Sequence, residues 1–448
     1  MKNIILTAFL LLMTASSYSQ SISGDKHPAL NHPVQLKANF ISSSPNKISG
    51  PDQIKMDSLK SHPPHHDELS ISLGGYLETF YSYNFNKPSN NINALRGFDF
   101  IANSLTVGNF VIGTDARYKN FSTRLAINIG MTPSQFYKQE PVTPASNMVP
   151  SLSSSTWQMI QEALISYDFE RIKGLTVQMG IMATPIGVEG LPSFQTWVGS
   201  AKNHHMHKKD YRENWNFSRS NAFIHVPDYH SGIRMLYTPD EKSTYSLYLI
   251  NGQNMVTDNN PQKTLALSYL WTPKPGFYLS ALYMGGNERP TGSVEGKSWR
   301  HLFDFHTKFQ LSPKLTLMAQ FVPGFETTEV GTNSFVINAV YLKYDLSEKT
   351  NLAMRYEHLL ERKSAESNSN FLETFDENQE AGLYGLTGTV SHILIPDHLM
   401  IRGEYRYDYG TEDWFFEGSL QPSGNNYYPF KTNTNQQNTV SFSVVGWF

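Results

Sequence analysis

Residues 439–448 read Thr-Val-Ser-Phe-Ser-Val-Val-Gly-Trp-Phe. The side chains of an extended strand alternate between its two faces. One face of this strand would be apolar, with Val440, Phe442, Val444 and Phe448. The other face would be polar, with Thr439, Ser441 and Ser443. The length suits a tilted strand that crosses a bilayer in about 9–11 residues, so we predict the closing strand of a transmembrane β-barrel.

The composition agrees with an all-β membrane protein. Aromatic residues make up 13% of the 448 residues, yet the mean hydropathy is −0.40. Transmembrane barrels combine these two values because lipid-facing and lumen-facing residues alternate and cancel in any average. The chain has no cysteine, which excludes a disulfide scaffold. Its formal net charge of −3 provides no basic field for binding nucleic acid.

The N-terminal residues differ from the rest of the chain. Residues 1–19 have the pattern of a secretory signal peptide, with Lys2 as the positive charge, an apolar core at 4–13 and the small residues Ser17 and Ser19 at the expected cleavage site. The core is shorter than the roughly 17–25 residues of a membrane-anchor helix, which is the alternative. Residues 20–69 are polar and lack a clear period, so we expect a disordered periplasmic leader. Residues 70–448 would then form the barrel domain.

Alternation with a period of two recurs along residues 70–448, and residues 401–409 give the clearest case. The apolar and aromatic positions there are Ile401, Tyr405, Tyr407 and Tyr409. The charged positions between them are Arg402, Glu404, Arg406 and Asp408. We expect the tyrosines to face the lipid headgroups and the charges to face water inside the barrel.

Short and long connections alternate between these stretches. Tight-turn sequences are expected at 115–119, 170–174, 238–242, 272–276, 311–314, 345–349 and 395–397. Long polar segments are expected at 86–97, 132–156, 185–228, 252–261, 286–298, 323–332, 360–379 and 410–434. This alternation is typical of an up-and-down membrane barrel, with short periplasmic turns and longer extracellular loops. A soluble β-sandwich, the alternative for any one strand, has no reason to alternate strictly.

The pattern predicts about sixteen antiparallel strands. They are 70–85, 98–114, 120–131, 157–168, 174–184, 229–237, 243–251, 262–271, 277–285, 299–310, 314–322, 333–344, 350–359, 380–392, 398–409 and 435–448. An even number of strands puts both ends of the barrel domain in the periplasm. The bore of a barrel of this size is too wide for side chains to fill, so we expect an aqueous channel.

Several segments carry distinctive motifs. Residues 75–88 read Gly-Tyr-Leu-Glu-Thr-Phe-Tyr-Ser-Tyr-Asn-Phe-Asn-Lys-Pro, residues 184–189 read Thr-Pro-Ile-Gly-Val-Glu, and residues 214–220 read Asn-Trp-Asn-Phe-Ser-Arg-Ser. In these segments the chain resembles the OmpL-like outer-membrane β-barrel porins, the β-barrel porin 2 family. The resemblance extends over nearly all of residues 74–448. The histidine-rich residues 202–210 do not match the family and are interpreted as a local insertion.

The resemblance implies a bacterial outer-membrane porin, either general or substrate-preferring, with no enzyme activity. We expect passive diffusion of small hydrophilic solutes through it, with no cofactor and no metal. The resemblance also implies contact with outer-membrane lipids and insertion by the barrel assembly machinery. That machinery would read the C-terminal strand, here Phe442, Val444 and Phe448. A homo-oligomer fits a large porin, although no residue pattern specifies one. Two functions remain as alternatives: an outer-membrane lipid hydrolase, which needs a Ser-His pair near a membrane interface, and a plugged structural or adhesin barrel.

Residues 185–228 form the longest connection within the predicted barrel, and connections of this length are usually functional or disordered. We expect this segment to fold into the lumen as a constriction, where arginines and carboxylates sort solutes by charge. Its candidate residues are Arg212, Glu213, Trp215 and Arg219, with Trp197 and Trp215 available to stack on flat solutes. An extracellular loop packed on itself is the alternative.

Charged residues on the predicted strands complete the candidate selectivity site. They are Arg234, Arg355, Glu357, Arg402, Glu404, Arg406 and Asp408. An arginine on the lipid face at mid-bilayer costs about 2–4 kcal/mol, so the lumen is the favoured side. The alternative role for these charges is to cross-link the wall without selecting solutes. His204, His205 and His207 have the density of a Zn²⁺ or Cu²⁺ site, but flanking lysines oppose a cation, so no metal is predicted.

Overall fold

The structure is a computed structural model and describes residues 68–142, 150–190, 213–364, 380–423 and 429–448. Several sequence predictions fall outside these residues. They are the signal peptide, all but the last two residues of the leader, Trp197, Arg212, and the histidines His204, His205 and His207.

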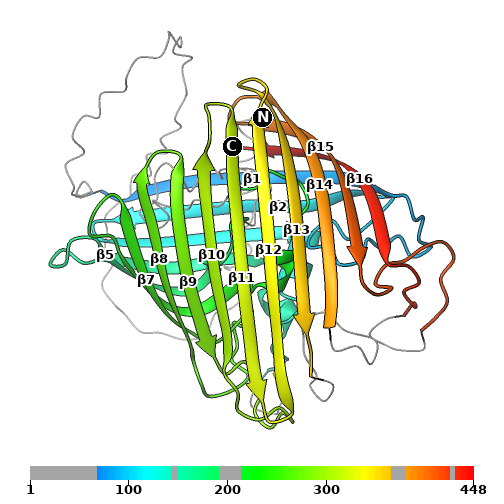
Figure 1. The fold of residues 1–448 in the computed structure, drawn as a ribbon. Coiled ribbons are helices and arrows are strands. Elements are labelled where there is room, and N and C mark those ends of the chain that lie inside the picture. The colour runs from blue at the N-terminus through cyan, green and yellow to red at the C-terminus, as the bar shows by residue number, and fades with distance from the viewer. Residues whose placement is uncertain (1–67, 143–149, 191–212, 365–379, 424–428) are drawn as a thin grey trace, which may run out of the picture. The chain divides into compact units, whose positions relative to one another are not determined.

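In the described residues, sixteen β-strands close into one antiparallel barrel (Figure 1). The strands are β1 (Ser70–Asn84), β2 (Leu105–Tyr118), β3 (Phe121–Gly130), β4 (Ile160–Asp168), β5 (Leu175–Ala183), β6 (Tyr229–Tyr237), β7 (Ser243–Ile250), β8 (Thr264–Lys274), β9 (Phe277–Gly286), β10 (Arg300–Gln310), β11 (Leu315–Thr328), β12 (Gly331–Asp345), β13 (Thr350–Arg362), β14 (Glu380–Ile395), β15 (Leu399–Gly410) and β16 (Gln436–Trp447). Each strand pairs with its neighbours in sequence, and β16 pairs with β1. The predicted all-β, up-and-down barrel of about sixteen strands is confirmed.

Within the part of the chain that the structure describes, the connections contain three short helices: α2 (Met131–Phe136), α3 (Ser154–Trp157) and α5 (Asn221–His225). No helix of the described residues is long and apolar enough to cross a membrane.

Side chains alternate across the barrel wall as the sequence predicts. In β16, the outward Phe442 is 51% exposed, whereas the inward Ser441 is 4% exposed. The tyrosines of β15 point outward, and its four charged side chains point inward and are buried. An apolar outer surface with a polar inner face is the arrangement that a barrel in a bilayer requires.

Aromatic side chains form two girdles on the outer surface. One lies near the short turns, where Tyr245 stacks on Tyr269 with ring centroids 4.9 Å apart. The other lies near the long connections, where His358 stacks on Tyr384 at 4.4 Å. Amphipathic rings at both borders of an apolar band are typical of the two membrane–water interfaces. We call these two ends of the barrel the turn end and the loop end.

The C-terminal residue completes the wall at the turn end. Gly75 of β1 donates its N–H to the carbonyl of Phe448 at 3.2 Å, and Phe448 donates to the carbonyl of Gly75 at 3.1 Å. A Cβ at position 75 would lie 2.5 Å from the carbonyl oxygen of Val111 and 2.9 Å from the Phe448 ring. Only glycine fits between the two neighbouring strands here.

One predicted connection is wrong. Residues 323–332 are not a long loop, because β11 continues to Thr328 and β12 begins at Gly331, with Thr328 paired to Gly331. The period of two persists through this region, with Phe325 facing outward and Glu326 buried inside the barrel. The polar residues that suggested a loop are the inward positions of two long strands. Short and long connections therefore do not alternate strictly.

Other strand boundaries also differ from the predictions, and β2 and β8 are examples. β2 begins at Leu105, because residues 98–103 fold back on the preceding loop, where Asn93 donates to the Phe100 carbonyl at 2.8 Å. At its other end β2 runs through most of the turn predicted at 115–119 and stops at Tyr118. β8 likewise continues to Lys274 within the turn predicted at 272–276.

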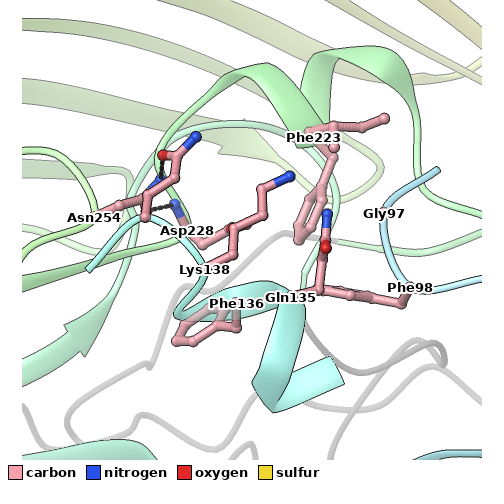
Figure 2. A pocket seen from close by; sticks show the side chains of 10 residues that line it. Gly97, Phe98, Gln135, Phe136, Lys138, Phe223, Asp228 and Asn254 are labelled. Atoms are coloured by element: carbon pink, nitrogen blue, oxygen red, sulfur yellow. Dashed lines mark hydrogen bonds between the residues drawn. The ribbon is translucent and has the colours of Figure 1, made fainter. Parts of the chain in front are cut away.

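The interior is less open than the sequence predicts. Inward apolar side chains of β7–β14, such as Met284 and Leu302, pack into one buried cluster with residues of the connections. The connections contribute Ala94, Ile186, Ala222, Val226 and the run Trp414 to Phe416. Burial of these apolar surfaces holds the connections inside the wall. A small cavity remains between four connections at the loop end (Figure 2).

Candidate pore-lining site

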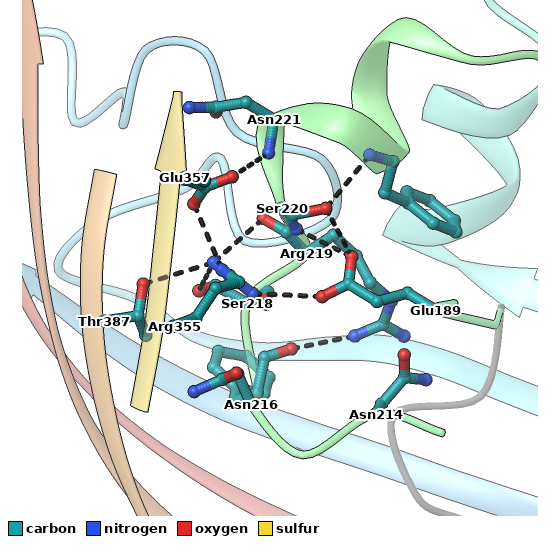
Figure 3. Close-up of polar contacts among 12 residues, drawn as sticks. Glu189, Asn214, Asn216, Ser218, Arg219, Ser220, Asn221, Arg355, Glu357 and Thr387 are labelled. Carbon is teal, nitrogen blue, oxygen red and sulfur yellow. Dashed lines mark hydrogen bonds and ion pairs between the residues drawn. The ribbon is translucent and has the colours of Figure 1, made fainter. Parts of the chain in front are cut away.

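Residues 213–220 cross the inside of the barrel and lie against β13, β14 and β15 (Figure 3). A chain segment inside a barrel has no neighbouring strand to satisfy its backbone, so other polar groups must bind its N–H and C=O groups. Here the charged side chains of the wall provide those partners.

Glu404 and Arg402 of β15 hold the first part of this segment. The Glu404 carboxylate accepts the N–H groups of Phe217 at 2.6 Å and Ser218 at 3.0 Å. Arg402 donates to the carbonyl oxygens of Asn214 at 2.9 Å and Asn216 at 3.3 Å. The carboxylate accepts hydrogen bonds from backbone N–H groups and the guanidinium donates to backbone carbonyl oxygens, which fixes the backbone in one orientation.

Arg355 of β13 is the most highly connected side chain of the site and is fully buried. Its guanidinium lies 3.1 Å from Glu189 Oε1 and 3.1 Å from Glu357 Oε1. It also donates to the Ser218 carbonyl at 2.6 Å and to Thr387 Oγ1 of β14 at 3.2 Å. One arginine therefore joins two wall strands to both ends of the long β5–β6 connection.

The ion pairs continue toward the β1–β2 connection. Arg406 lies 3.3 Å from Glu357 and 2.8 Å from Asp408. Arg96, on that connection, lies 2.7 Å from Asp408 and 3.2 Å from Asp99. Acids and arginines thus alternate in one buried chain: Glu189, Arg355, Glu357, Arg406, Asp408, Arg96 and Asp99. Buried charges need such partners because an isolated buried ion is strongly disfavoured.

Glu189 also fixes the start of α5. Its Oε2 accepts from both the N–H and the hydroxyl of Ser220 at 2.8 Å. The Ser220 hydroxyl oxygen in turn accepts the Phe223 N–H at 3.1 Å and caps the helix. The next residue, Asn221, donates its N–H to Glu357.

Trp215 and Glu213 lie where the segment enters the interior. Trp215 is buried against Tyr341, with ring centroids 6.4 Å apart and Lys343 Nζ 5.3 Å above the indole. Its Nε1 donates to Glu213 at 2.7 Å, and Glu213 also pairs with Lys308 of β10. The expectation that Trp215 stacks on a solute is therefore wrong for this structure, because packing covers its ring.

Arg219 and Arg234 occupy separate positions. Arg219 lies over the rings of Phe98 and Phe223 and donates to the Gly190 carbonyl at 3.1 Å. Arg234 points inward from β6, where it donates to Gln178 at 2.7 Å and covers Tyr248. The structure therefore brings most of the predicted site residues together and leaves Arg234 apart from them.

Several partners of the site were not predicted, among them Glu189, Ser218, Ser220 and Arg96. Glu189, Ser218 and Ser220 lie in the motifs at 184–189 and 214–220. The motifs therefore pointed to these positions, although the charge and size of the residues did not identify them as partners of the site. Arg96 had no such signal. Its role depends on a connection that reaches β15 only in the folded barrel.

Two titratable groups near α5 have perturbed pKa values. Burial lowers the pKa of His225 to about 4, against a smaller raising contribution from a backbone hydrogen bond. Burial raises the pKa of Asp228 to about 8, although Lys138 and Arg219 act to lower it. Both shifts have the sign expected when desolvation disfavours the charged form.

The closed wall, the two aromatic girdles and the polar interior define a large membrane-spanning β-barrel of the porin type. The sequence matches the family described as putative beta-barrel porin-2, OmpL-like, over residues 70–200 and 210–448. The chain belongs to this family and is an outer-membrane porin.

Solved structures share the fold. OmpT of Vibrio cholerae, an outer membrane protein solved in a trimer form, has a TM-score of 0.51 and 11% identity, covering 85% of this chain and 100% of that chain. An anion-selective porin from Comamonas acidovorans has a TM-score of 0.50 and 10% identity, covering 85% of this chain and 100% of that chain. At such identities the likeness concerns the fold alone. No curated protein matches the sequence significantly.

Proposed function

We propose that the protein lets small hydrophilic solutes diffuse passively through a bore whose width is set by residues 213–220. The observation that carries this proposal is the attachment of that segment to the inner wall by Arg355, Arg402 and Glu404. A segment held by buried, charge-assisted hydrogen bonds keeps one position, so it can act as a fixed constriction.

The predicted selectivity residues then divide into two roles. The buried charges of β13 and β15 position the segment, since they pair with one another and bind its backbone. They are Arg355, Glu357, Arg402, Glu404, Arg406 and Asp408. Glu213 and Lys308 keep part of their side chains exposed and are better candidates for direct contact with solutes. Arg234 would line another part of the wall.

The wider setting belongs to the same proposal. Export through the inner membrane would use the signal peptide at residues 1–19, and the barrel assembly machinery would recognise the last strand through Phe442, Val444 and Phe448. Phe442 and Val444 face outward in β16, and Phe448, directly after that strand, is also exposed, which supports that role. The surrounding partner is the lipid of the outer membrane, and the protein performs no chemical step. Formation of a homo-oligomer is also part of this proposal.

Recording from planar bilayers tests the function. The purified protein should give discrete conductance steps, and the reversal potential in a salt gradient should report its ion preference. Silent membranes with folded protein would favour the plugged barrel, which the apolar cluster at the loop end would explain. Release of fatty acids from vesicles without conductance would favour the lipid hydrolase instead.

A further inference from the structure

Three polar and aromatic side chains lie on the outer surface where the β9–β10 connection enters the wall. Lys297 and Trp299 are exposed, and His301 is half-buried. Ser298 and Arg300, which alternate with them, are buried and both contact one carboxylate inside the barrel. The period of two therefore extends ahead of β10, and it places Lys297, Trp299 and His301 on the outward face at the loop end.

Tyr283 of β9, the strand beside β10, fixes the imidazole of His301 (Figure 1). The Tyr283 hydroxyl lies 3.0 Å from His301 Nδ1. The contact needs glycine at position 285, because a Cβ there would lie 2.2 Å from the hydroxyl oxygen. Nδ1 is the acceptor that the described residues offer to this hydroxyl, so the hydroxyl donates and His301 carries its own proton on Nε2.

The Nε2–H group of His301 is left as an open donor. It has no hydrogen-bond acceptor among the described residues, and the protein does not enclose it. Phe325 stacks on the ring with centroids 4.7 Å apart, and Trp299 lies beside it at 6.1 Å. These contacts hold the imidazole at the outer surface of the wall. A donor without an acceptor is costly at the border of the hydrocarbon, so an acceptor from a lipid headgroup would be favourable there.

Lys297 adds a positive charge to the same face. It has no ion-pair partner among the described residues, although the Glu329 side chain lies close to the neighbouring Gly296. Aromatic side chains of the loop-end girdle mark the level of the headgroups. A headgroup phosphate at this level can accept the Nε2–H of His301 and pair with Lys297, whereas an ester carbonyl can satisfy the donor alone.

We propose that Lys297, Trp299 and His301 form a docking site for a phosphorylated lipid of the outer membrane. A phosphate oxygen accepts the Nε2–H of His301, the phosphate charge pairs with Lys297, and Trp299 lies at the border between headgroup and acyl chains. Tyr283 is a positioning residue that sets the tautomer of His301. The site is on the outer surface and does not depend on the diffusion function.

Native mass spectrometry of the purified protein in detergent tests the site. The probes are phosphatidic acid and diacylglycerol with the same acyl chains, in equal amounts, and inorganic phosphate in a separate experiment. The protein should retain about five-fold more phosphatidic acid than diacylglycerol, because the phosphate gains a charge-assisted hydrogen bond and a partly screened ion pair. Inorganic phosphate should not be retained, since it lacks the acyl chains that lie against the wall.

Two variants and their matched controls assign the preference. His301→Phe keeps an aromatic ring but removes the donor, so the two lipids should be retained almost equally. His358→Phe is its control, because His358 is also outward at the loop end but its Nε2 is enclosed beside Tyr384. Lys297→Gln should lower the preference about two-fold, whereas Lys314→Gln, at the turn end, should keep the parental value.

Several results would overturn the site: equal retention of the two lipids by the parent protein, retention of inorganic phosphate, or a preference that survives His301→Phe. A preference lost equally in His301→Phe and His358→Phe would also overturn it, because the whole girdle and not this site would then select the lipid. If His301→Phe does not give the fast-migrating folded band, Lys297→Gln decides in its place, and an unchanged preference would then contradict the site.

Discussion

Arg406 Nη2 of β15 lies 3.3 Å from Glu357 Oε1 of β13, so the two side chains join across the intervening strand β14. Glu357 also accepts from Arg355 Nε at 3.1 Å and from the N–H of Asn221. The same carboxylate therefore cross-links the wall and holds the connection that enters the barrel. The wall and the constriction are stabilised by one set of charges.

Replacing Glu357 by Gln should destabilise the protein by about 3–5 kcal/mol, because two buried guanidinium groups lose their shared counter-charge. The loss should show as a lower urea midpoint in detergent, followed by tryptophan fluorescence. Glu380→Gln is the matched control. Its pair with Arg362 is 53% and 71% exposed, so its loss should cost no more than about 1 kcal/mol. Equal midpoints for the two variants would contradict a stabilising role for the buried chain of charges.

Glu404→Gln should loosen the constriction without removing the barrel. The carboxylate accepts two backbone N–H groups, and an amide NH₂ at one of these positions would oppose a donor. We expect larger and noisier single-channel conductance with an unchanged far-UV spectrum. Asp397→Asn, in the short turn between β14 and β15, should conduct like the parent protein. A Glu404 variant with parental conductance would show that residues 213–220 do not limit the bore.

Gly75→Val should prevent closure of the barrel. The new side chain would meet the Val111 carbonyl oxygen and the Phe448 ring where β1 joins the C-terminal residue. We expect loss of the fast-migrating folded band in gels run without heating. Gly388→Ala provides the control, because a Cβ there meets nothing within 4 Å. If the Gly75 variant kept the folded band, closure at this position would not depend on glycine.

Asp228 should make stability fall as pH rises. Its pKa is about 8 in the folded protein and 3.8 as an isolated group, so between these values the folded state holds a proton that the unfolded state has released. Stability from this group is therefore lost with increasing pH across that window. His225, with its pKa lowered to about 4 from 6.5, acts in the opposite direction between those two values.

Asp228→Asn should remove the loss of stability that Asp228 causes as pH rises and keep the opposite effect of His225. Melting temperatures of the parent and the variant should be similar near pH 4 and should separate toward pH 8, with the variant the more stable. Circular dichroism at a series of pH values in one detergent measures the difference. Parallel curves across the range would show that Asp228 ionises normally in the folded protein.

Most of the wall could be predicted because its signal is local. The alternation in residues 401–409 assigns each side chain to a face, and neighbouring strands then pair by the same rule. The failures at 98–103 and 323–332 have a common cause. In both stretches a loop or a strand was assigned from the polarity of the residues alone, without knowledge of the groups that lie opposite them in the fold. Glu326 is tolerated inside the barrel because Arg289 and Arg300 contact it there.

The candidate site was only partly predictable. Charge and strand parity identified Arg355, Arg402 and Arg406 as inward residues, which they are. That Glu189 and a backbone segment would cover these arginines, and that Arg96 would share Asp408 with Arg406, could not be predicted, because these partners are separated by more than a hundred residues from at least one of the arginines.

The sequence by itself determined the membrane barrel, its strand number, its inward and outward faces and its family, since each depends on periodicity and short motifs. Only the tertiary structure decided what occupies the interior and which charges compensate one another. Those features arise when distant connections meet inside the closed wall, where low polarity requires every buried charge to have a partner.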